Sequence, residues 1–508
     1  MNLYDILVRL ADPSLLLTIL ICTLYGALIG ALPGLSATMA VALLVPFTFF
    51  MDPVTAIAAI VATASTGIFA GDISGALLRI PGTPASAAYV ADASTIAHSG
   101  RPRTILFVSL FSGTLGGIIG VIALSFATPV LARFATNFSS DEMFWLALLG
   151  LSCAVFVADA PPAKTFASLF IGLAIATVGI DVAVGMPRYT FGLYDLYDGV
   201  DFISAMIGFF AVTELFRAAL ERKEPNGEPP PLRMEPLWTA VKDAAGIIRN
   251  RWASVVRSGP LGVIIGVLPG AGADVAAWVA YALARRFSRT PEKFGKGHDE
   301  GIVAGGASNN AAVGGAWTPA IVFGIPGDSV TAIAIGVLMM KGLTPGPDIF
   351  ERSGEIVYTL FGAFLIANIF MVLTGGVAIL LASQLLRMPK SLLMPLVLAL
   401  SLIGGFAVMN TVFSIWIIIV LGIVGFLMIL GGIPIAPAIL GVVLGKTLEQ
   451  NFMTSMIKAQ GDFTQLFARD IAMVLGIVTI LIWGVCIYRA VRTIITPPQP
   501  RNLKDSET

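Results

Sequence analysis

Gly26-Ala-Leu-Ile-Gly30-Ala-Leu-Pro33-Gly34-Leu-Ser36 is the stretch that decides the fold, because a near copy of it returns in the second half of the chain. The copy, Gly262-Val-Ile-Ile-Gly266-Val-Leu-Pro269-Gly270-Ala-Gly272, begins 236 residues later. Each copy is followed by a second interrupted stretch, Ile80-Pro81-Gly82-Thr83 in the first half and Ile325-Pro326-Gly327-Asp328 in the second. The chain therefore consists of two related halves, each interrupted twice.

The composition is that of a membrane protein. Of 508 residues, 56% are hydrophobic and only 12% are charged, whereas soluble domains carry about 25% charged residues. Apolar runs long enough to cross a bilayer recur from Leu15 to Tyr488. We expect an all-α polytopic membrane protein with about 10–12 transmembrane helices plus broken or re-entrant helical hairpins.

Charge predicts the organisation of the chain. Residues 1–220 form the first membrane half, 221–258 a basic cytoplasmic linker, 259–490 the second half and 491–508 a polar tail. Basic loops flank the Pro269 run on both sides, whereas mainly acidic residues flank the Pro33 run, which favours an inverted repeat. The basic C-terminal tail argues in the other direction, so the orientation of the termini stays open.

Several classes of function are excluded by what the sequence lacks. The formal net charge is zero, so the electrostatic footprint of a nucleic-acid-binding protein is missing. Neither a His-Glu-x-x-His metal motif nor a Gly-x-x-x-x-Gly-Lys-Ser/Thr nucleotide loop occurs. We therefore expect no metal, no organic cofactor, no ATP-driven pumping and no catalytic residues. An intramembrane aspartyl protease is disfavoured, because the nearest motif, Phe69-Ala-Gly71-Asp72, lacks its first glycine.

The paired interruptions indicate a binding site. Proline and glycine break a helix, and broken backbone at membrane depth survives only where protein or a water-filled cavity satisfies it. Interruptions at matching places in two halves are typical of a transporter substrate site, and helix starts there suit a carboxylate; a simple proline kink is the alternative. The substrate-binding candidates at the breaks are Pro33, Gly34, Leu35, Ser36, Pro81, Gly82, Thr83, Pro269, Gly270, Pro326, Gly327 and Asp328.

Polar residues inside the apolar runs add further candidates. Asn309 and Asn310 could bind a carboxylate, share a sodium ion, or join two helices by a hydrogen bond. Arg79 could clamp an anion or extend to the lipid headgroups. We add these three to the substrate candidates. Ser65 and Thr66, for which helix packing is the alternative, join Asn310 as candidates for a coupling ion.

These motifs resemble the large membrane subunit of the tripartite tricarboxylate transporters, the TctA type. The resemblance runs from about residue 20 to 470. The chain differs from the usual family sequence at two positions. It has Arg79 where the family often has Asn, and Gly306 where the family often has an acidic residue. The motifs that carry it are Leu32-Pro-Gly34, Ile80-Pro-Gly-Thr-Pro-Ala-Ser86, Gly266-Val-Leu-Pro-Gly270, Asn309-Asn-Ala311, Phe323-Gly-Ile-Pro-Gly327 and Pro437-Ala-Ile-Leu-Gly441.

The resemblance implies a secondary transporter of the bacterial inner membrane that imports a small di- or tricarboxylate by symport with sodium or protons. It also implies two partners, a small four-helix membrane subunit and a periplasmic solute-binding protein that delivers the solute. An anion channel without ion coupling is the alternative function, because it would use the same breaks.

Overall fold

The chain folds into two compact units, each made of two segments. In this computed structural model the first unit comprises Met1–Phe138 and Val200–Phe426, and the second comprises Ser139–Gly199 and Leu427–Thr508. The structure describes residues 3–32, 35–157, 160–181, 185–220, 234–268, 272–386 and 411–495, and in addition 395, 398–399, 402–403 and 405–406.

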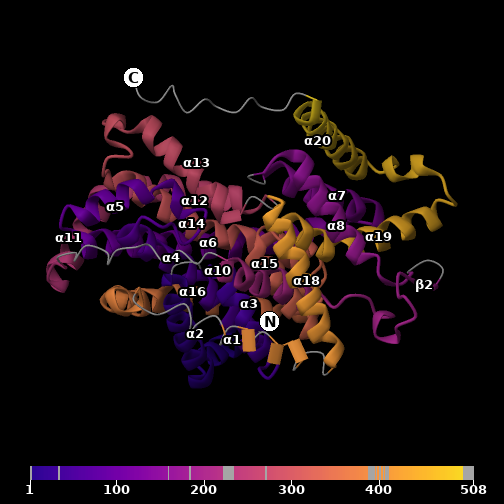
Figure 1. The fold of residues 1–508 in the computed structure, drawn as a ribbon, viewed down its shortest axis with the longest axis horizontal. Coiled ribbons are helices and arrows are strands. Elements are labelled where there is room, and N and C mark those ends of the chain that lie inside the picture. Colours follow the sequence, from indigo (N-terminus) through magenta and orange to yellow (C-terminus); the bar gives the residue numbers. More distant parts are fainter. Residues whose placement is uncertain are drawn as a thin grey trace. The chain divides into compact units, whose positions relative to one another are not determined.

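The first unit holds the helices that carry both repeated stretches (Figure 1). In chain order its elements are α1 (Leu3–Leu10), α2 (Pro13–Ala31), α3 (Ala37–Thr48), α4 (Pro53–Leu78), the 3-10 turn η1 (Ser86–Ala88), α5 (Val90–His98), α6 (Pro102–Ala135), α9 (Phe202–Met206), the π-helical turn η3 (Ile207–Val212), α10 (Thr213–Leu220), α11 (Leu237–Asn250), α12 (Trp252–Gly266), α13 (Gly272–Phe287), η4 (Pro291–Lys293), α14 (Asp299–Phe323), α15 (Ser329–Met340), α16 (Ile349–Leu385) and α18 (Val412–Leu430), whose residues 427–430 belong to the second unit.

The second unit is smaller. Its elements are α7 (Ser140–Val157), α8 (Pro162–Ala176), the strands β1 (Gly179–Ile180) and β2 (Pro187–Arg188), the 3-10 turn η2 (Tyr194–Leu196), α19 (Ala436–Lys458), η5 (Phe463–Phe467) and α20 (Asp470–Ile495).

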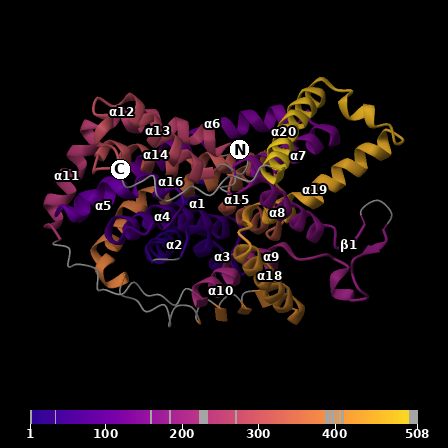
Figure 2. The same cartoon turned by 45° about the horizontal axis from the view of Figure 1, so that its top comes forward.

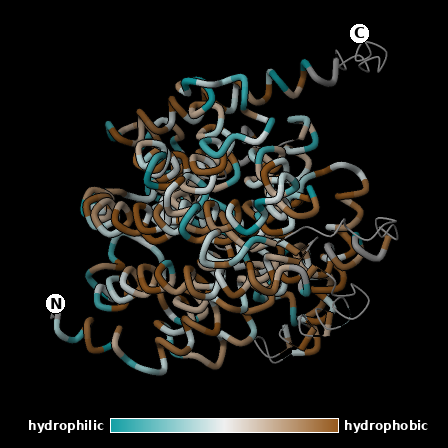
Figure 3. Tube along the Cα trace, turned by 90° about the vertical axis from the view of Figure 1, so that its left-hand side faces the viewer, coloured by the Kyte–Doolittle hydropathy of each residue, from teal (hydrophilic) through white to brown (hydrophobic). Residues whose placement is uncertain are grey.

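The predicted class, an all-α polytopic membrane protein, is confirmed. Six of the described helices, α2, α4, α6, α16, α18 and α20, are long and apolar enough to cross a membrane, and α3, α8 and α15 are shorter apolar helices. The one sheet among the described residues is the short β1–β2 hairpin, and hydrophobic residues recur along the helical trace (Figure 3). The total of about 10–12 crossings stays a prediction.

The helices end where the sequence predicts interruptions. Helix α2 stops at Ala31 and α3 begins at Ala37, while α12 stops at Gly266 and α13 begins at Gly272. Of the predicted linker, residues 221–233 lie outside the described residues, and 237–250 form α11.

The two halves repeat one helix packing. Helix α2 packs along α4, and α12 packs along α14 in the same way. A Cβ added at Gly26 would lie 2.9 Å from the Cα of Thr63, and one added at Gly262 would lie 2.9 Å from the Cα of Ser308. The same 2.9 Å approach recurs one turn later, between Gly30 and Gly67 and between Gly266 and Ala312. Small residues at these positions let the backbones touch, as in small-xxx-small packing in membranes.

The long helices α6 and α16 exchange between the halves. Helix α6 of the first half packs along α14 of the second, while α16 of the second half packs along α4 and α2 of the first (Figure 2). As a result α4 is enclosed by protein, with 94% of its most apolar window buried. Polar side chains on α4 therefore face other helices, which is the setting in which a membrane tolerates them.

The second unit is held by pairs between its two chain segments. Helix α19 packs on α7 and α8, and α20 packs on α7. The buried carboxylate of Glu142 pairs with Arg469 at 3.2 Å. Arg188 of the hairpin pairs with Glu449 at 2.7 Å and with Asp181 at 3.6 Å. The pairs with Arg469 and Glu449 tie residues 139–199 to residues 427–508.

Replacing Gly262 with alanine tests the repeated packing. The new methyl group would overlap the Ser308 backbone, so we expect the free energy of unfolding to fall by about 1–3 kcal/mol. The matched control is Gly484→Ala in the apolar helix α20, where an added Cβ meets no atom within 4 Å and should be neutral or slightly stabilising. Thermal unfolding in detergent measures both, and an unchanged midpoint for Gly262→Ala would contradict the close approach.

Candidate functional site

The breaks of both halves meet at one cavity in the first unit. Its volume is about 70 Å³, which is room for several water molecules. The starts of α3, α13 and α15 and the turn before η1 all contribute to its wall. The lining residues are Ser36, Ala37, Thr38, Ile68, Thr83, Pro84, Ala273, Asp274, Asn309, Asp328, Ser329 and Val330.

Helix α3 presents its first turn to the cavity. The Ser36 hydroxyl caps the helix by accepting a hydrogen bond of 3.2 Å from the Met39 backbone N–H. Ala37 and Thr38, the first two helical residues, line the cavity beside it. The first turn of a helix carries backbone N–H groups without intrahelical partners and a partial positive charge, so this wall suits an anion.

The same reciprocal pair of capping hydrogen bonds forms at the second break of each half. Thr83 N–H donates to the Ser86 hydroxyl at 3.2 Å, and Ser86 N–H donates to the Thr83 hydroxyl at 3.1 Å. At the equivalent positions, Asp328 N–H donates to the Thr331 hydroxyl at 3.0 Å, and Thr331 N–H donates to Asp328 Oδ1 at 2.7 Å. Such capping boxes start a helix abruptly, which places Thr83 and Asp328 at the cavity.

A close backbone approach fixes both Pro-Gly turns. A Cβ added at Gly82 would lie 2.6 Å from the Cα of Gly71, and one added at Gly327 would lie 2.6 Å from the Cα of Ala316. Gly82 N–H also donates to the Gly71 carbonyl at 3.2 Å. Each turn therefore folds back on the helix that precedes it, α4 or α14, and only glycine fits at the contact.

A buried hydrogen-bond cluster lies near Asn309. The Tyr89 hydroxyl donates to the Asp72 carboxylate at 2.9 and 3.1 Å, and the Ser109 hydroxyl donates to the same carboxylate. Asn309 lines the cavity and is 2% exposed. Its Oδ1 is buried and has no hydrogen-bond partner among the described residues.

The two sides of the cavity differ in charge. The second half contributes the carboxylates of Asp274 and Asp328, and Ala85 N–H donates to Asp274 Oδ1 at 3.2 Å. The equivalent positions of the first half hold Thr38 and Thr83, which also line the cavity. The first-half wall is thus neutral and rich in hydroxyls, the second-half wall is acidic, and none of the described lining residues is Lys or Arg.

The structure brings a subset of the predicted substrate residues together. Ser36, Thr83, Asn309 and Asp328 all line the cavity. Three others adjoin lining residues in the chain, namely Leu35, Gly82 and Gly327. Pro326 is buried one residue farther away, and Pro81 is exposed. Pro33, Gly34, Pro269 and Gly270 lie outside the described residues.

Other predicted residues lie elsewhere. Arg79 is exposed, ends α4 in the left-handed conformation, and donates from Nε to the Ser94 hydroxyl at 2.9 Å. Ser65 and Thr66 donate to carbonyls of their own helix, those of Val61 and Ala62. Asn310 Nδ2 lies 3.5 Å from the Met371 sulfur. None of these predicted residues is part of the cavity wall, and their roles in binding stay predictions.

Sequence reasoning missed several cavity residues. Thr38, Asp274 and Ser329 line the cavity. The sequence repeat could have identified Thr38 and Asp274. Thr38 and Asp274 occupy equivalent positions just after the first break of each half, where any first-turn residue faces the same site.

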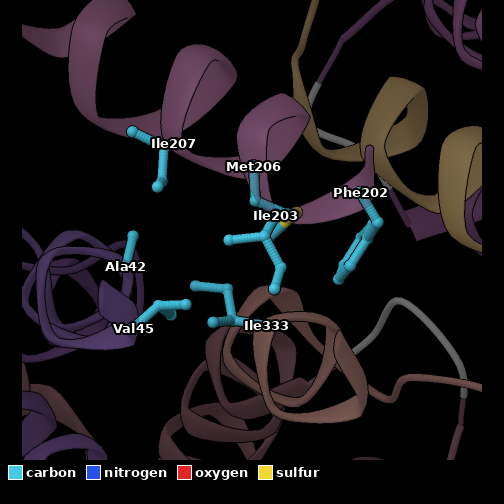
Figure 4. Close-up of a pocket in the computed structure, with 7 residues that line it drawn as sticks. All are labelled: Ala42, Val45, Phe202, Ile203, Met206, Ile207 and Ile333. Atoms are coloured by element: carbon cyan, nitrogen blue, oxygen red, sulfur yellow. The ribbon is translucent and has the colours of Figure 1, made fainter. Parts of the chain in front are cut away.

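A second cavity in the first unit is not a candidate site. It is about 10 Å³ in volume and lies between α3, α9, η3 and α15 (Figure 4). The side chains that converge on it are Ala42, Val45, Phe202, Ile203, Met206, Ile207 and Ile333. A space of this size holds at most about one water, and an apolar lining gives that water no partner.

Substitution of Asp328 separates its capping role from its charge. We expect Asp328→Ala to lower the free energy of unfolding by about 1 kcal/mol, because the α15 cap is lost, whereas Asn replaces Asp at a helix N-terminus with little cost. Thermal unfolding of the two variants measures the difference. Equal destabilisation by Ala and Asn would contradict the capping geometry.

The sequence matches a known protein family over most of its length. The sequence profile of the tripartite tricarboxylate transporter TctA family matches residues 16–440, which confirms the resemblance carried by the motifs. No solved structure matches the chain.

Two relatives come from Agrobacterium vitis. One, described as "uncharacterized 52.8 kDa protein in TAR-I ttuC' 3'region", is 32% identical over 449 residues, which are 88% of each chain. The other, described as "uncharacterized protein in TAR-II ttuC' 3'region", is 33% identical over 224 residues, 44% of this chain and 93% of that one.

Proposed function

Because the chain belongs to the tripartite tricarboxylate transporter TctA family, we propose that it is the translocation subunit of a secondary transporter that imports a small di- or tricarboxylate. The family and the apolar helices make it a multi-pass membrane transport protein. The bacterial inner membrane, the carboxylate substrate and the coupling to an ion gradient are parts of the proposal.

One observation carries the proposal: the interrupted segments of both halves meet at a single polar cavity. A carboxylate there would face the first turn of α3 and the hydroxyl groups of Ser36, Thr38 and Thr83. Transporters built from repeats commonly bind substrate between broken helices near the bilayer midplane. The inverted relation of the halves belongs to the same proposal.

The energy source in this proposal is an ion gradient. A nucleotide-binding loop does not occur in it, so uptake against a gradient would draw on sodium or protons. The word tripartite in the family description supports two partners, the small four-helix membrane subunit and the periplasmic solute-binding protein. We propose that the latter delivers the substrate to this chain.

The competing functions fit the cavity less well. Anion pores are lined by Arg or Lys, whereas this wall carries two carboxylates and no basic residue among the described ones. The near match to an aspartyl protease motif ends at Asp72, which does not line the cavity and accepts hydrogen bonds from Tyr89 and Ser109.

Reconstitution tests the proposal. Labelled citrate and C4 dicarboxylates are offered to proteoliposomes that contain this chain with its small subunit and binding protein, under a sodium gradient, a proton gradient or neither. We expect accumulation that requires both a gradient and the binding protein. Equilibration without a gradient would instead identify an anion channel.

Filling the cavity tests its place in the pathway. Ala273 lines it and is 8% exposed, so a leucine there would occupy much of the 70 Å³. We expect Ala273→Leu to reduce carboxylate uptake by about tenfold or more, the loss that corresponds to about 1.4 kcal/mol of binding free energy. Ala91→Leu, at an exposed position on α5, is the matched control. Normal uptake by Ala273→Leu would place the pathway elsewhere.

A further inference from the structure

We propose that residues 185–199 of the second unit, the aromatic loop, form the surface on which the periplasmic solute-binding protein docks. The inference rests on the proposed function, which supplies the partner. It adds the place of contact and the chemistry that recognises the partner there. The aromatic loop contains strand β2 and the turn η2, and it projects away from α8 and α19 (Figure 2).

The aromatic loop exposes several large side chains. Phe191 is 85% exposed and Tyr194 is 83% exposed, and Met186 and Tyr189 are also mostly exposed. Lipid-exposed irregular backbone does not occur within the hydrocarbon layer, so these side chains lie outside it. Exposed apolar side chains that gather on one segment mark an interaction site, and Tyr is among the residues that contribute most to binding energy at protein interfaces.

Ion pairs and strand pairing hold the aromatic loop in place. Arg188 pairs with Glu449 of α19 at 2.7 Å, and the β1–β2 pairing sets Arg188 opposite Gly179. Tyr189 and Phe191 adopt the left-handed backbone conformation, with φ of 53° and 52°. That conformation is unfavourable for residues other than glycine and persists only where the surrounding structure imposes it. An ordered backbone therefore presents the aromatic side chains, which reduces the entropy lost on binding.

Contacts within the second unit indicate on which side of the membrane the aromatic loop lies. Helix α8 leads to the loop and runs in the same direction as α19. Near the start of α8, Lys164 Nζ donates to the Gly431 carbonyl, just before α19, at 2.8 Å. At the end of α8, Ala176 lies against Gly445 of α19. The loop is therefore on the side toward which α19 runs.

Helix α20 places that side away from the cytoplasm. At the end of α19, Lys458 Nζ donates to the hydroxyl of Ser140, at the start of α7, at 3.2 Å. Glu142 in the first turn of α7 pairs with Arg469, just before α20, at 3.2 Å, so the start of α20 shares the side of the loop. Helix α20 is long enough to cross a membrane, and the basic residues in 489–504 assign its far end to the cytoplasm. The aromatic loop then faces the periplasm.

The chain that follows the aromatic loop gives the same assignment. Residues 202–220 are helical throughout, as α9, η3 and α10, and are about 28 Å long, which is close to the thickness of the hydrocarbon layer. The basic linker comes directly after them. Its charge predicts a cytoplasmic location, which again places the aromatic loop on the periplasmic side.

The charge of the aromatic loop favours a protein partner over a lipid surface. Asp195 and Asp198 are exposed, and the one basic residue of the loop, Arg188, is paired with Glu449 and Asp181. Anionic headgroups repel carboxylates, whereas basic side chains at the rim of a protein interface complement them. The partner that fits is a soluble protein with an apolar centre and a basic rim. On the periplasmic side the proposed function supplies one, the solute-binding protein.

Docking can be measured without transport. The full chain is reconstituted with its small subunit in lipid nanodiscs, and the affinity of the purified solute-binding protein for these nanodiscs is measured by surface plasmon resonance. We expect Phe191→Ala and Tyr194→Ala each to weaken binding by about tenfold or more, as truncation of an aromatic anchor does at an interface. Asp195→Asn should slow association, and the difference should shrink at high salt.

The controls separate the contact from folding and from exposure alone. Trp238→Ala is the matched control, because Trp238 is 79% exposed but belongs to α11 in the linker that is expected to be cytoplasmic. Its affinity for the binding protein should equal that of the unaltered chain. Tyr194→Phe keeps the ring and should retain most of the affinity, and the thermal unfolding midpoint of each variant reports whether it folds.

The outcomes are distinct for the docking surface and for the transport function. Unchanged affinity in Phe191→Ala and Tyr194→Ala, or no binding to the unaltered chain, would overturn the surface. Loss of the small subunit from the loop variants would also overturn it, because the loop would then contact that subunit; carboxylate uptake driven by an ion gradient would still uphold transport. Weaker binding by the loop variants with normal binding by Trp238→Ala supports the surface, even if no carboxylate accumulates.

Discussion

Every helix interrupted inside a membrane must find partners for the backbone groups that the interruption frees, and this requirement organises the first unit. Water is absent from the hydrocarbon core, so caps must come from the protein itself. Ser36 caps α3, the Thr83–Ser86 pair caps the turn before η1, and the Asp328–Thr331 pair caps α15. Because these three caps meet in one place, polar groups gather there around a cavity.

The helix packing repeats between the two halves, whereas the side chains at the cavity differ. Helix contacts made through Gly26 and Gly262 are the same in both halves, as are the Pro-Gly turns at Gly82 and Gly327. At the cavity, however, the first half places Thr where the second places Asp. Close backbone packing leaves no freedom to change the glycines without overlap, whereas a capping residue can be Thr or Asp at similar cost. These differences therefore lie at the helix starts.

The sequence predicted the fold class and the place of the breaks, because apolar length and Pro-Gly pairs act locally. It also predicted Ser36, Thr83, Asn309 and Asp328, which lie beside breaks or inside an apolar run. Other cavity features depend on tertiary contacts. Nothing local indicated that Tyr89 and Ser109 would bond to Asp72, or that Arg79 would bond to Ser94. The pairing of Thr38 with Asp274 was readable only by aligning the halves residue by residue.

The buried Asp72 shows how the first unit accommodates a carboxylate inside an apolar helix. A carboxylate enclosed within a helix bundle is costly to retain unless it has a partner or a role. Asp72 accepts hydrogen bonds from the hydroxyls of Tyr89, which precedes α5, and of Ser109 on α6, and it does not line the cavity. Its partners therefore join α4 to the two helices that follow the second break, and the polar groups of the cavity wall come from the helix starts instead.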